Sequence, residues 1–257
     1  MNTKTILAIA GIMLFTLTAT AQTRKNVTRQ KTAVKSVKKS AAPIEDPKLV
    51  DLGLPSGTKW ADRNMGARSS SSGGGYYAFG ETSEKQLYKK DNYTFKADIT
   101  DIAGTEYDAA TKKYGKDWSI PTSQQWQELI DNCTKEITSV NGQLGVKFTA
   151  KNGNSIVLPS PYPMVKAGTA EETKSLNNQF LEGVESAKQQ VKAYGINASV
   201  LFSVYRTSDS NLLVALGLAT IASDGTAKEF QKQIEVIPGQ KFIYGGFQIR
   251  PVSRTSY

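Results

Sequence analysis

Apolar residues recur at helical spacing in two stretches of the chain, 122–133 and 170–194, and a further stretch, 108–115, has the end signals of a short helix. The stretch 122–133 begins with a capping box formed by Thr122 and Gln125, and its apolar residues fall on one face: Trp126, Leu129, Ile130 and Cys133. In the stretch 108–115, an aspartate stands at the N-cap position and a glycine follows the last turn. The sequence therefore predicts two short helices and one long helix.

Strands are predicted on both sides of these helices. Residues 50–54 alternate in polarity, and the turn 55–57 leads to a second short strand over 58–61. The aromatic content of residues 76–79 favours a strand, and 146–158 has the pattern of a hairpin. Four further runs rich in β-forming residues follow the long helix: 198–205, 212–221, 230–237 and 242–252. Helices in the middle and strands at both ends favour an α+β domain whose first and last strands pair.

The N-terminus has the three parts of a secretory signal peptide. Lys4 gives a positive start, 6–17 is an apolar stretch, and 19–21 is an A-x-A cleavage site. A spanning helix needs ~20 apolar residues, which is more than this stretch supplies. We therefore expect residues 1–21 to be removed, so that the mature chain begins at Gln22 and is periplasmic, on the outer surface or extracellular. The alternative interpretation is a retained N-terminal anchor.

The net charge of +9 is unevenly distributed. Residues 22–48 contain eight basic and two acidic residues, a net of +6, whereas the chain from Leu49 onward contains 23 basic and 21 acidic residues. The first segment also lacks hydrophobic periodicity, so we expect a basic disordered linker. Such a linker is either a solvated spacer or an attachment to anionic polymers or lipid headgroups. Residues 49–257 are expected to form one globular domain, whose near neutrality argues against nucleic-acid binding.

Several kinds of chemistry are excluded by residue types that the sequence lacks. With no histidine, Ser-His-Asp and Cys-His catalysis and histidine-containing zinc sites are impossible. The single cysteine, Cys133, cannot form an internal disulfide and is interpreted as a small core residue. No catalytic residue and no cofactor is assigned. A carboxylate-based hydrolase is the alternative, although its candidate glutamates have the spacing of a solvated helix face: Glu171, Glu172, Glu182 and Glu185.

Two groups of residues are candidates for ligand contacts. Aromatic rings stack on pyranose faces and also fill cores, and six of them gather in the first half of the chain: Trp60, Tyr76, Tyr77, Phe79, Trp118 and Trp126. We interpret the group mainly as core and keep Trp60, Tyr76 and Tyr77 as ligand-binding candidates. An acidic group offers oxygen ligands to calcium but lacks EF-hand spacing: Asp98, Asp101, Glu106 and Asp108. No metal site is assigned, and the last of these is interpreted as a helix cap.

Five phrases of the sequence resemble the Fibrobacter succinogenes major paralogous domain family of exported Bacteroidota proteins. They are VDLGLPSGTKWADRNMGA (50–67), YYAFGET (76–82), DAATKKYGKDWSIPTSQQWQELIDNC (108–133), NGNSIVLP (152–159) and YGGFQIRPV (244–252). The resemblance implies a C-type-lectin-like fold, related to that of the sulfatase-modifying factors. Such a fold would be a mixed α+β domain with paired terminal strands, two to three helices and long loops.

The chain also departs from these relatives. Segment 170–194 is expected to be an inserted helix, and 200–205 matches the family's aromatic-serine phrase poorly. The EPN or QPD and WND phrases of calcium-dependent lectins are absent, and Cys133 alone cannot supply the paired active-site cysteines of the sulfatase-modifying factors. The expected function is therefore a secreted or cell-surface, non-catalytic binding or structural domain. Its partner would be a glycan, a surface protein or an anionic envelope polymer; the alternatives are a carboxylate-based hydrolase and an envelope assembly accessory protein.

Overall fold

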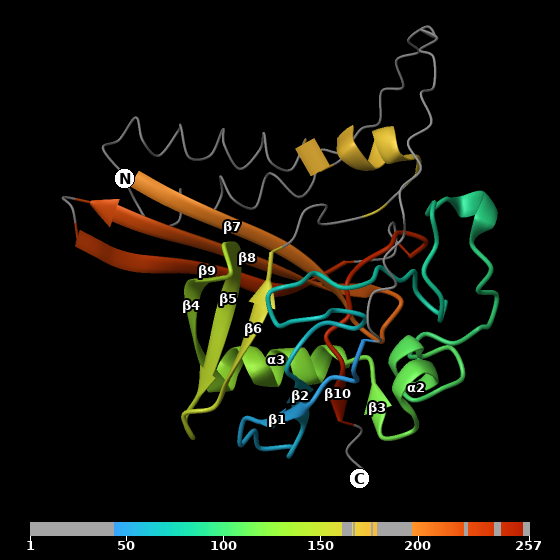
Figure 1. The fold of residues 1–257 in the computed structure, drawn as a ribbon, viewed down its shortest axis with the longest axis horizontal. Coiled ribbons are helices and arrows are strands. Elements are labelled where there is room, and N and C mark those ends of the chain that lie inside the picture. Colours follow the sequence, from blue (N-terminus) through green and yellow to red (C-terminus); the bar gives the residue numbers. More distant parts are fainter. Residues whose placement is uncertain are drawn as a thin grey trace, which may run out of the picture. The chain divides into compact units, whose positions relative to one another are not determined.

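The N-terminal hairpin and the last strand of the chain share one antiparallel sheet (Figure 1). β1 (Leu49–Asp51) pairs with β2 (Lys59–Ala61), β2 with β10 (Val252–Ser253), and β10 with β3 (Trp118–Ser119). The strand order is therefore β1-β2-β10-β3. The two ends of the domain therefore share one sheet, but the predicted pairing of the first strand with the last is wrong, because β2 lies between β1 and β10.

The computed structural model describes residues 44–160, 166, 168–175, 177–178, 197–223, 226–238 and 243–253. Residues 44–257 form one compact unit, in which helices and antiparallel sheets are mixed, so the α+β class is confirmed. The signal peptide predicted over 1–21 and all but the last residues of the predicted linker lie outside the described ranges; 44–48 has no regular secondary structure. None of the described helices is both long and apolar enough to cross a membrane.

The two short helices begin where local sequence signals place them. α2 (Ala109–Tyr114) follows Asp108, whose side chain caps its first turn. α3 (Ser123–Asn132) has the predicted capping box, because the hydroxyl of Thr122 accepts the N–H of Gln125 and the Gln125 amide accepts the N–H of Thr122. Both helices therefore start in fixed positions beside the first sheet.

A second antiparallel sheet follows α3 directly. It consists of β4 (Cys133–Val140), β5 (Gln143–Ala150) and β6 (Ser155–Pro159), in that order. The hairpin of β5 and β6 matches the prediction, whereas β4 was not predicted. The missed signal is the turn between β4 and β5, where Asn141 and Gly142 have φ values of 51° and 77°. An Asn-Gly pair at positive φ is the preferred turn of a tight hairpin.

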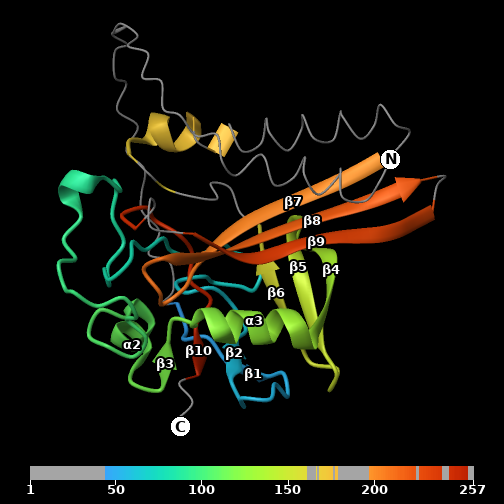
Figure 2. The same ribbon diagram turned by 180° about the vertical axis from the view of Figure 1, so that it is seen from behind.

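The third sheet contains the longest strands of the described chain. β7 (Asn197–Arg206), β8 (Leu212–Ser223) and β9 (Thr226–Pro238) pair in sequence order, as Figure 2 shows from behind. They match the three predicted runs at 198–205, 212–221 and 230–237. α3 contacts β4, β8 and β9, so this helix joins the second and third sheets.

The fourth predicted run, 242–252, is not one strand. Phe247 bridges Tyr77, Gly246 bridges Lys166, and Gln248 lies parallel to Tyr205 as isolated pairs. Because successive residues pair with three different segments, no ladder longer than one bridge forms before β10. The strand predicted over 76–79 is wrong for the same reason, since only its Tyr77 takes part in a bridge.

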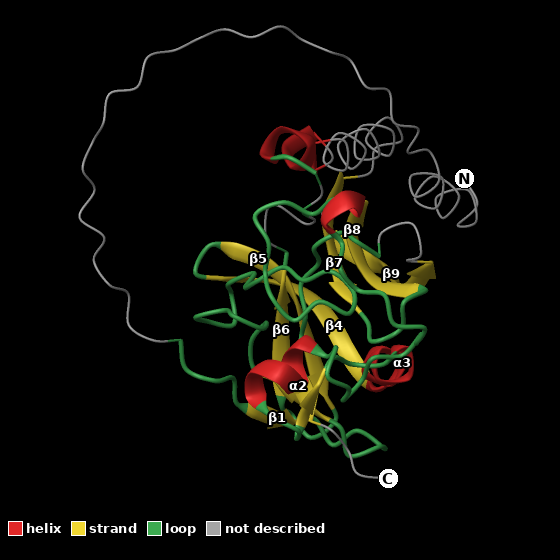
Figure 3. Cartoon of the chain, turned by 90° about the vertical axis from the view of Figure 1, so that its right-hand side faces the viewer, coloured by secondary structure: helices red, strands yellow, loops and turns green. Residues whose placement is uncertain are grey.

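The beginning of the predicted long helix is helical. Residues 170–175 and 177–178 have helical backbone (Figure 3), and the rest of 170–194 lies outside the described residues. Thr169 and Glu172 cap the start, since the Glu172 carboxylate accepts the N–H of Thr169 and the Thr169 hydroxyl accepts the N–H of Glu172.

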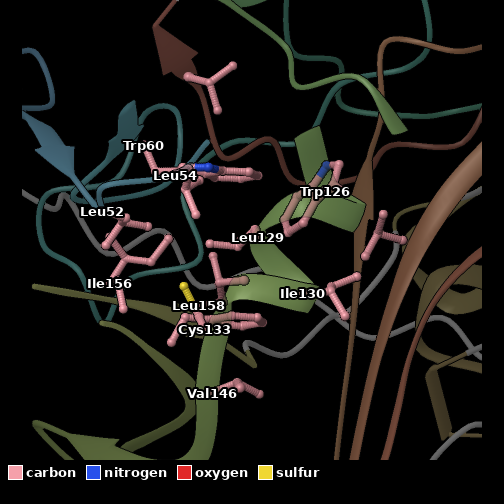
Figure 4. Packing of buried hydrophobic residues seen from close by; sticks show 14 of the residues in the cluster. Leu52, Leu54, Trp60, Trp126, Leu129, Ile130, Cys133, Val146, Ile156 and Leu158 are labelled. Atoms are coloured by element: carbon pink, nitrogen blue, oxygen red, sulfur yellow. The ribbon is translucent and has the colours of Figure 1, made fainter. Parts of the chain in front are cut away.

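The main hydrophobic core lies where α3 meets the first two sheets (Figure 4). Trp60 and Trp126 are both 0% exposed, and their ring centroids lie 4.8 Å apart at an interplanar angle of 66°. Cys133 belongs to the same cluster, and burial raises the pKa of its thiol. The interpretation of this cysteine as a core residue is confirmed. A second cluster, around Phe79, Ile102 and Ile249, packs beneath the loops that follow β2.

Candidate functional site

A long irregular segment, 62–108, separates β2 from α2. Its only regular element is the short 3-10 helix η1 (Lys90–Asn92). Long loops inside a compact domain are uncommon and often carry function. Three polar side chains of this segment are nevertheless buried: Asn64, Glu81 and Asp108. Their hydrogen bonds show whether this segment is held in a defined conformation.

The three ligand-binding candidates from the sequence are all buried. Trp60 packs against Trp126, and Tyr76 and Tyr77 are 6% and 3% exposed. A sugar that stacked on any of these rings would first have to displace the side chains that cover it. The structure also separates the candidates, since Trp60 belongs to the main core, Tyr77 to the cluster around Phe79, and Tyr76 to a smaller group with Tyr88.

Tyr76 belongs to a buried polar network that connects distant segments. The Gln248 amide donates to the Tyr76 hydroxyl at 3.4 Å, and the Asn64 amide donates to Gln248 Oε1 at 3.1 Å. The Tyr205 hydroxyl is 3.3 Å from the same Asn64 nitrogen and donates to the carbonyl of Pro159 at 3.0 Å. These bonds hold the loops to β7 and to the end of β6, so the network fixes the position of Tyr76.

Four tyrosine hydroxyls in this region are expected to resist ionisation. Burial raises the pKa of Tyr76 and Tyr88 to about 12, and it also raises the pKa of Tyr77 and Tyr93. Phenols ionise near pH 10 in the unfolded chain, so these groups contribute stability that is fully present below pH ~10 and is lost as pH rises towards the folded pKa. The urea midpoint should therefore fall between pH ~10 and ~12, and phenolate absorbance should appear together with unfolding. Ionisation of all 11 tyrosines near pH 10 in the folded protein would contradict this.

Glu81 fastens the middle of the irregular segment. Its Oε1 atom accepts the N–H of Thr94 at 2.7 Å, the Thr94 hydroxyl at 2.8 Å and the ammonium of Lys85 at 2.6 Å. Its side chain is buried, and these bonds compensate for removing Oε1 from water, whereas the buried Oε2 has no hydrogen-bond partner in the described structure. This residue was not predicted as a functional residue, although a glutamate two positions after the aromatic run 76–79 was a visible signal.

Asp108 fastens the end of the segment. Its carboxylate accepts four backbone N–H groups, those of Gly104, Ala110, Thr111 and Ile120, at 2.8–3.1 Å. Burial raises the pKa of this carboxyl, and the four donors oppose that rise. The predicted cap is confirmed, and the bonds to residues 104 and 120 extend its role beyond α2.

The other acidic candidates lie on the surface. Asp98, Asp101 and Glu106 are exposed, and the described residues contain no group of three or more potential metal ligands. Glu171 and Glu172 are also exposed, and the second of them caps its helix. The remaining hydrolase candidates, Glu182 and Glu185, lie outside the described residues.

Two arginines that the sequence analysis did not select are completely buried. Arg206 donates to the carbonyl of Gly245 at 2.7 Å, and its guanidinium lies 4.7 Å from the centroid of the Phe247 ring. Arg250 donates to the carbonyl of Ala61 at 3.1 Å and to that of Val157. Burial lowers the pKa of these groups to about 9 and about 10, so both stay charged at neutral pH. Each guanidinium connects strands to loops.

A set of aromatic rings lies half-buried at the surface of the loops and α2. Phe95 and Tyr107 pack edge to face at 5.2 Å, and Tyr114 lies 5.6 Å from Trp118. The interpretation of Trp118 as a core residue is therefore wrong. As the first residue of β3, at the edge of the first sheet, it has a neighbouring strand on one side only. Unlike Trp60 and Tyr76, these rings have surface that a ligand can reach.

Comparison with known proteins gives no relative for this chain: no family model, no curated protein and no solved structure matches it.

Proposed function

We propose that this chain is an exported, non-catalytic binding domain whose ligand is a glycan, a protein or another polymer of the cell envelope. The observation that carries the proposal is that buried hydrogen bonds hold the irregular segment 62–108 in one conformation. A segment with almost no regular structure is held by the buried carboxylates of Glu81 and Asp108 and by the network around Asn64. Loops that are already ordered lose little conformational entropy on binding, which favours recognition by a preformed surface.

Two observations support a non-catalytic function: the residue types that the chain lacks, and the structural role of its buried carboxylates. The chain contains no histidine, and the two buried acids of the segment accept hydrogen bonds that fix the loops. We also propose that the chain is related to the Fibrobacter succinogenes major paralogous domain family and has a C-type-lectin-like fold. A sheet that contains both the first and the last described strand, two short helices and long loops support this part of the proposal.

The proposal is tested by capture of the exported protein on its own cell envelope. We expect purified protein to be retained by an envelope fraction or by a glycan array. Glu81→Ala should weaken retention about tenfold, because the loops must then be ordered during binding. Glu84→Ala, a change at an exposed carboxylate of the same segment, is the matched control.

Two results would overturn the proposal. One is the absence of retention on every envelope fraction and every array feature. The other is release of new reducing ends from a retained glycan, which would identify a hydrolase.

A further inference from the structure

The end of α2 and the start of β3 form a small surface that combines aromatic rings with lysines. We call it the α2 surface and define it by five residues: Lys112, Lys113, Tyr114, Lys116 and Trp118. The rings of Tyr114 and Trp118 are half-buried, with centroids 5.6 Å apart and planes at 54°. Between them Gly115 has a φ of 97°, and a side chain built there would meet no atom within 4 Å. The surface is therefore open beside the rings.

The ring of Tyr114 and the backbone of Trp118 are held in place by the body of the protein. The Tyr114 hydroxyl accepts the N–H of Gly66 at 3.2 Å, which fixes the ring from its buried end. The carbonyl of Trp118 accepts the Thr111 hydroxyl at 2.6 Å, and its backbone pairs with Ser253 of β10. A ring that is fixed before binding, as that of Tyr114 is, offers a contact at low entropic cost.

The α2 surface presents three ammonium groups, with acids of other segments beside it. Lys112, Lys113 and Lys116 are exposed, and Asp117 is the only acid among residues 109–118. Glu84 lies near Lys113, and Asp46 is close enough to Tyr114 to raise the pKa of its hydroxyl. The Lys113 ammonium lies 5.6 Å from the centroid of the Tyr114 ring. These ten residues thus carry a net charge of +2, as much as residues 49–257 together. Positive charge concentrated beside open rings attracts a negatively charged ligand.

We infer that the α2 surface binds an anionic polysaccharide, one that bears carboxylate or sulfate groups. Pyranose faces would stack on the rings of Trp118 and Tyr114, and the three ammonium groups would pair with the acidic substituents. This inference rests on the proposed function and adds to it the surface and the ligand class. Single-stranded nucleic acid also combines rings with negative charge. An exported chain, as proposed above, meets envelope polysaccharide instead, so nucleic acid is an outcome of the test.

The inference is tested with the full exported chain and four probes: polygalacturonate, heparin, neutral dextran and a single-stranded oligonucleotide. Dissociation constants are measured at low salt and at 0.5 M salt. We expect binding to one or both acidic polysaccharides, weakening with salt because screening shortens the reach of the charges. Dextran should not bind. Tighter binding of the oligonucleotide than of both polysaccharides would overturn the assignment.

Variants locate the binding surface. The triple change Lys112→Gln, Lys113→Gln and Lys116→Gln should weaken binding by at least about tenfold, and so should Trp118→Ala. A second triple change at exposed lysines elsewhere removes the same charge and should weaken binding less than about twofold: Lys90→Gln, Lys96→Gln and Lys151→Gln. The lysine variants touch only exposed side chains, so they report binding even where Trp118→Ala disturbs β3.

The outcomes separate this inference from the proposed function. If the protein is retained on envelope but both triple lysine variants lose the same affinity, the proposed binding function stands. The α2 surface is then not the binding site. Absence of retention on any envelope fraction would overturn the proposed function itself.

Discussion

Replacing Trp126 by alanine is expected to lower the free energy of unfolding by about 3–5 kcal/mol. The side chain is 0% exposed, and its ring lies 4.8 Å from that of Trp60 and 5.5 Å from that of Tyr205. It therefore joins α3 to the first sheet and to β7. An aromatic ring of this size removes about 150–250 Å² from water, and a typical domain is stable by only about 5–15 kcal/mol. The measurement is urea unfolding followed by far-UV circular dichroism.

Two matched variants make the test specific. Trp118→Ala removes an identical side chain from a half-buried position and should cost no more than about 1 kcal/mol. Trp126→Phe should fall between these values, since the indole N–H of Trp126 has no hydrogen-bond partner in the described structure and only ring volume is lost. Equal losses for Trp126→Ala and Trp118→Ala would contradict the assignment of the core.

Features set by neighbouring residues could be predicted from the sequence. The capping box of Thr122 and Gln125 and the Asp108 cap depend on residues within one or two turns, so their patterns are visible in the chain. Local patterns also predicted the hairpin of β5 and β6 and the three long strands, β7, β8 and β9. β4 was missed because Lys135 and Glu136 interrupt its apolar pattern, although the Asn-Gly turn after it was a local signal.

Features that depend on distant segments could not be predicted. Arg250 can be buried because its guanidinium donates to carbonyl groups of Ala61 in β2 and Val157 in β6. No pattern near an arginine reveals such partners. The aromatic residues are a similar case, because rings suited to a core and rings suited to a ligand look alike in sequence. Tyr76, which was kept as a ligand candidate, is buried, whereas Trp118, which was interpreted as core, lies near the surface.

Replacing Asp108 by alanine is expected to lower the free energy of unfolding by at least about 3 kcal/mol. The change would leave four backbone N–H groups, of Gly104, Ala110, Thr111 and Ile120, without their acceptor. Loss of a helix cap alone costs about 0.5–2 kcal/mol, so a larger loss would report the bonds outside α2. Urea unfolding gives the free energy, and hydrogen exchange at residues 104 and 120 shows which amides open.

The asparagine variant separates the two roles of this side chain. Oδ1 of Asp108 accepts from Ala110 and Thr111, whereas Oδ2 accepts from Gly104 and Ile120. An amide keeps one oxygen but turns an N–H₂ group towards the other pair of donors. Asp108→Asn should therefore keep the cap and still expose the amides of residues 104 and 120 to exchange. Asp101→Ala is the matched control, since its exposed carboxylate accepts the single N–H of Ala103 and its loss should cost less than about 1 kcal/mol. A stability loss for Asp108→Ala as small as that of the control would mean that the carboxylate does not hold the segment in place.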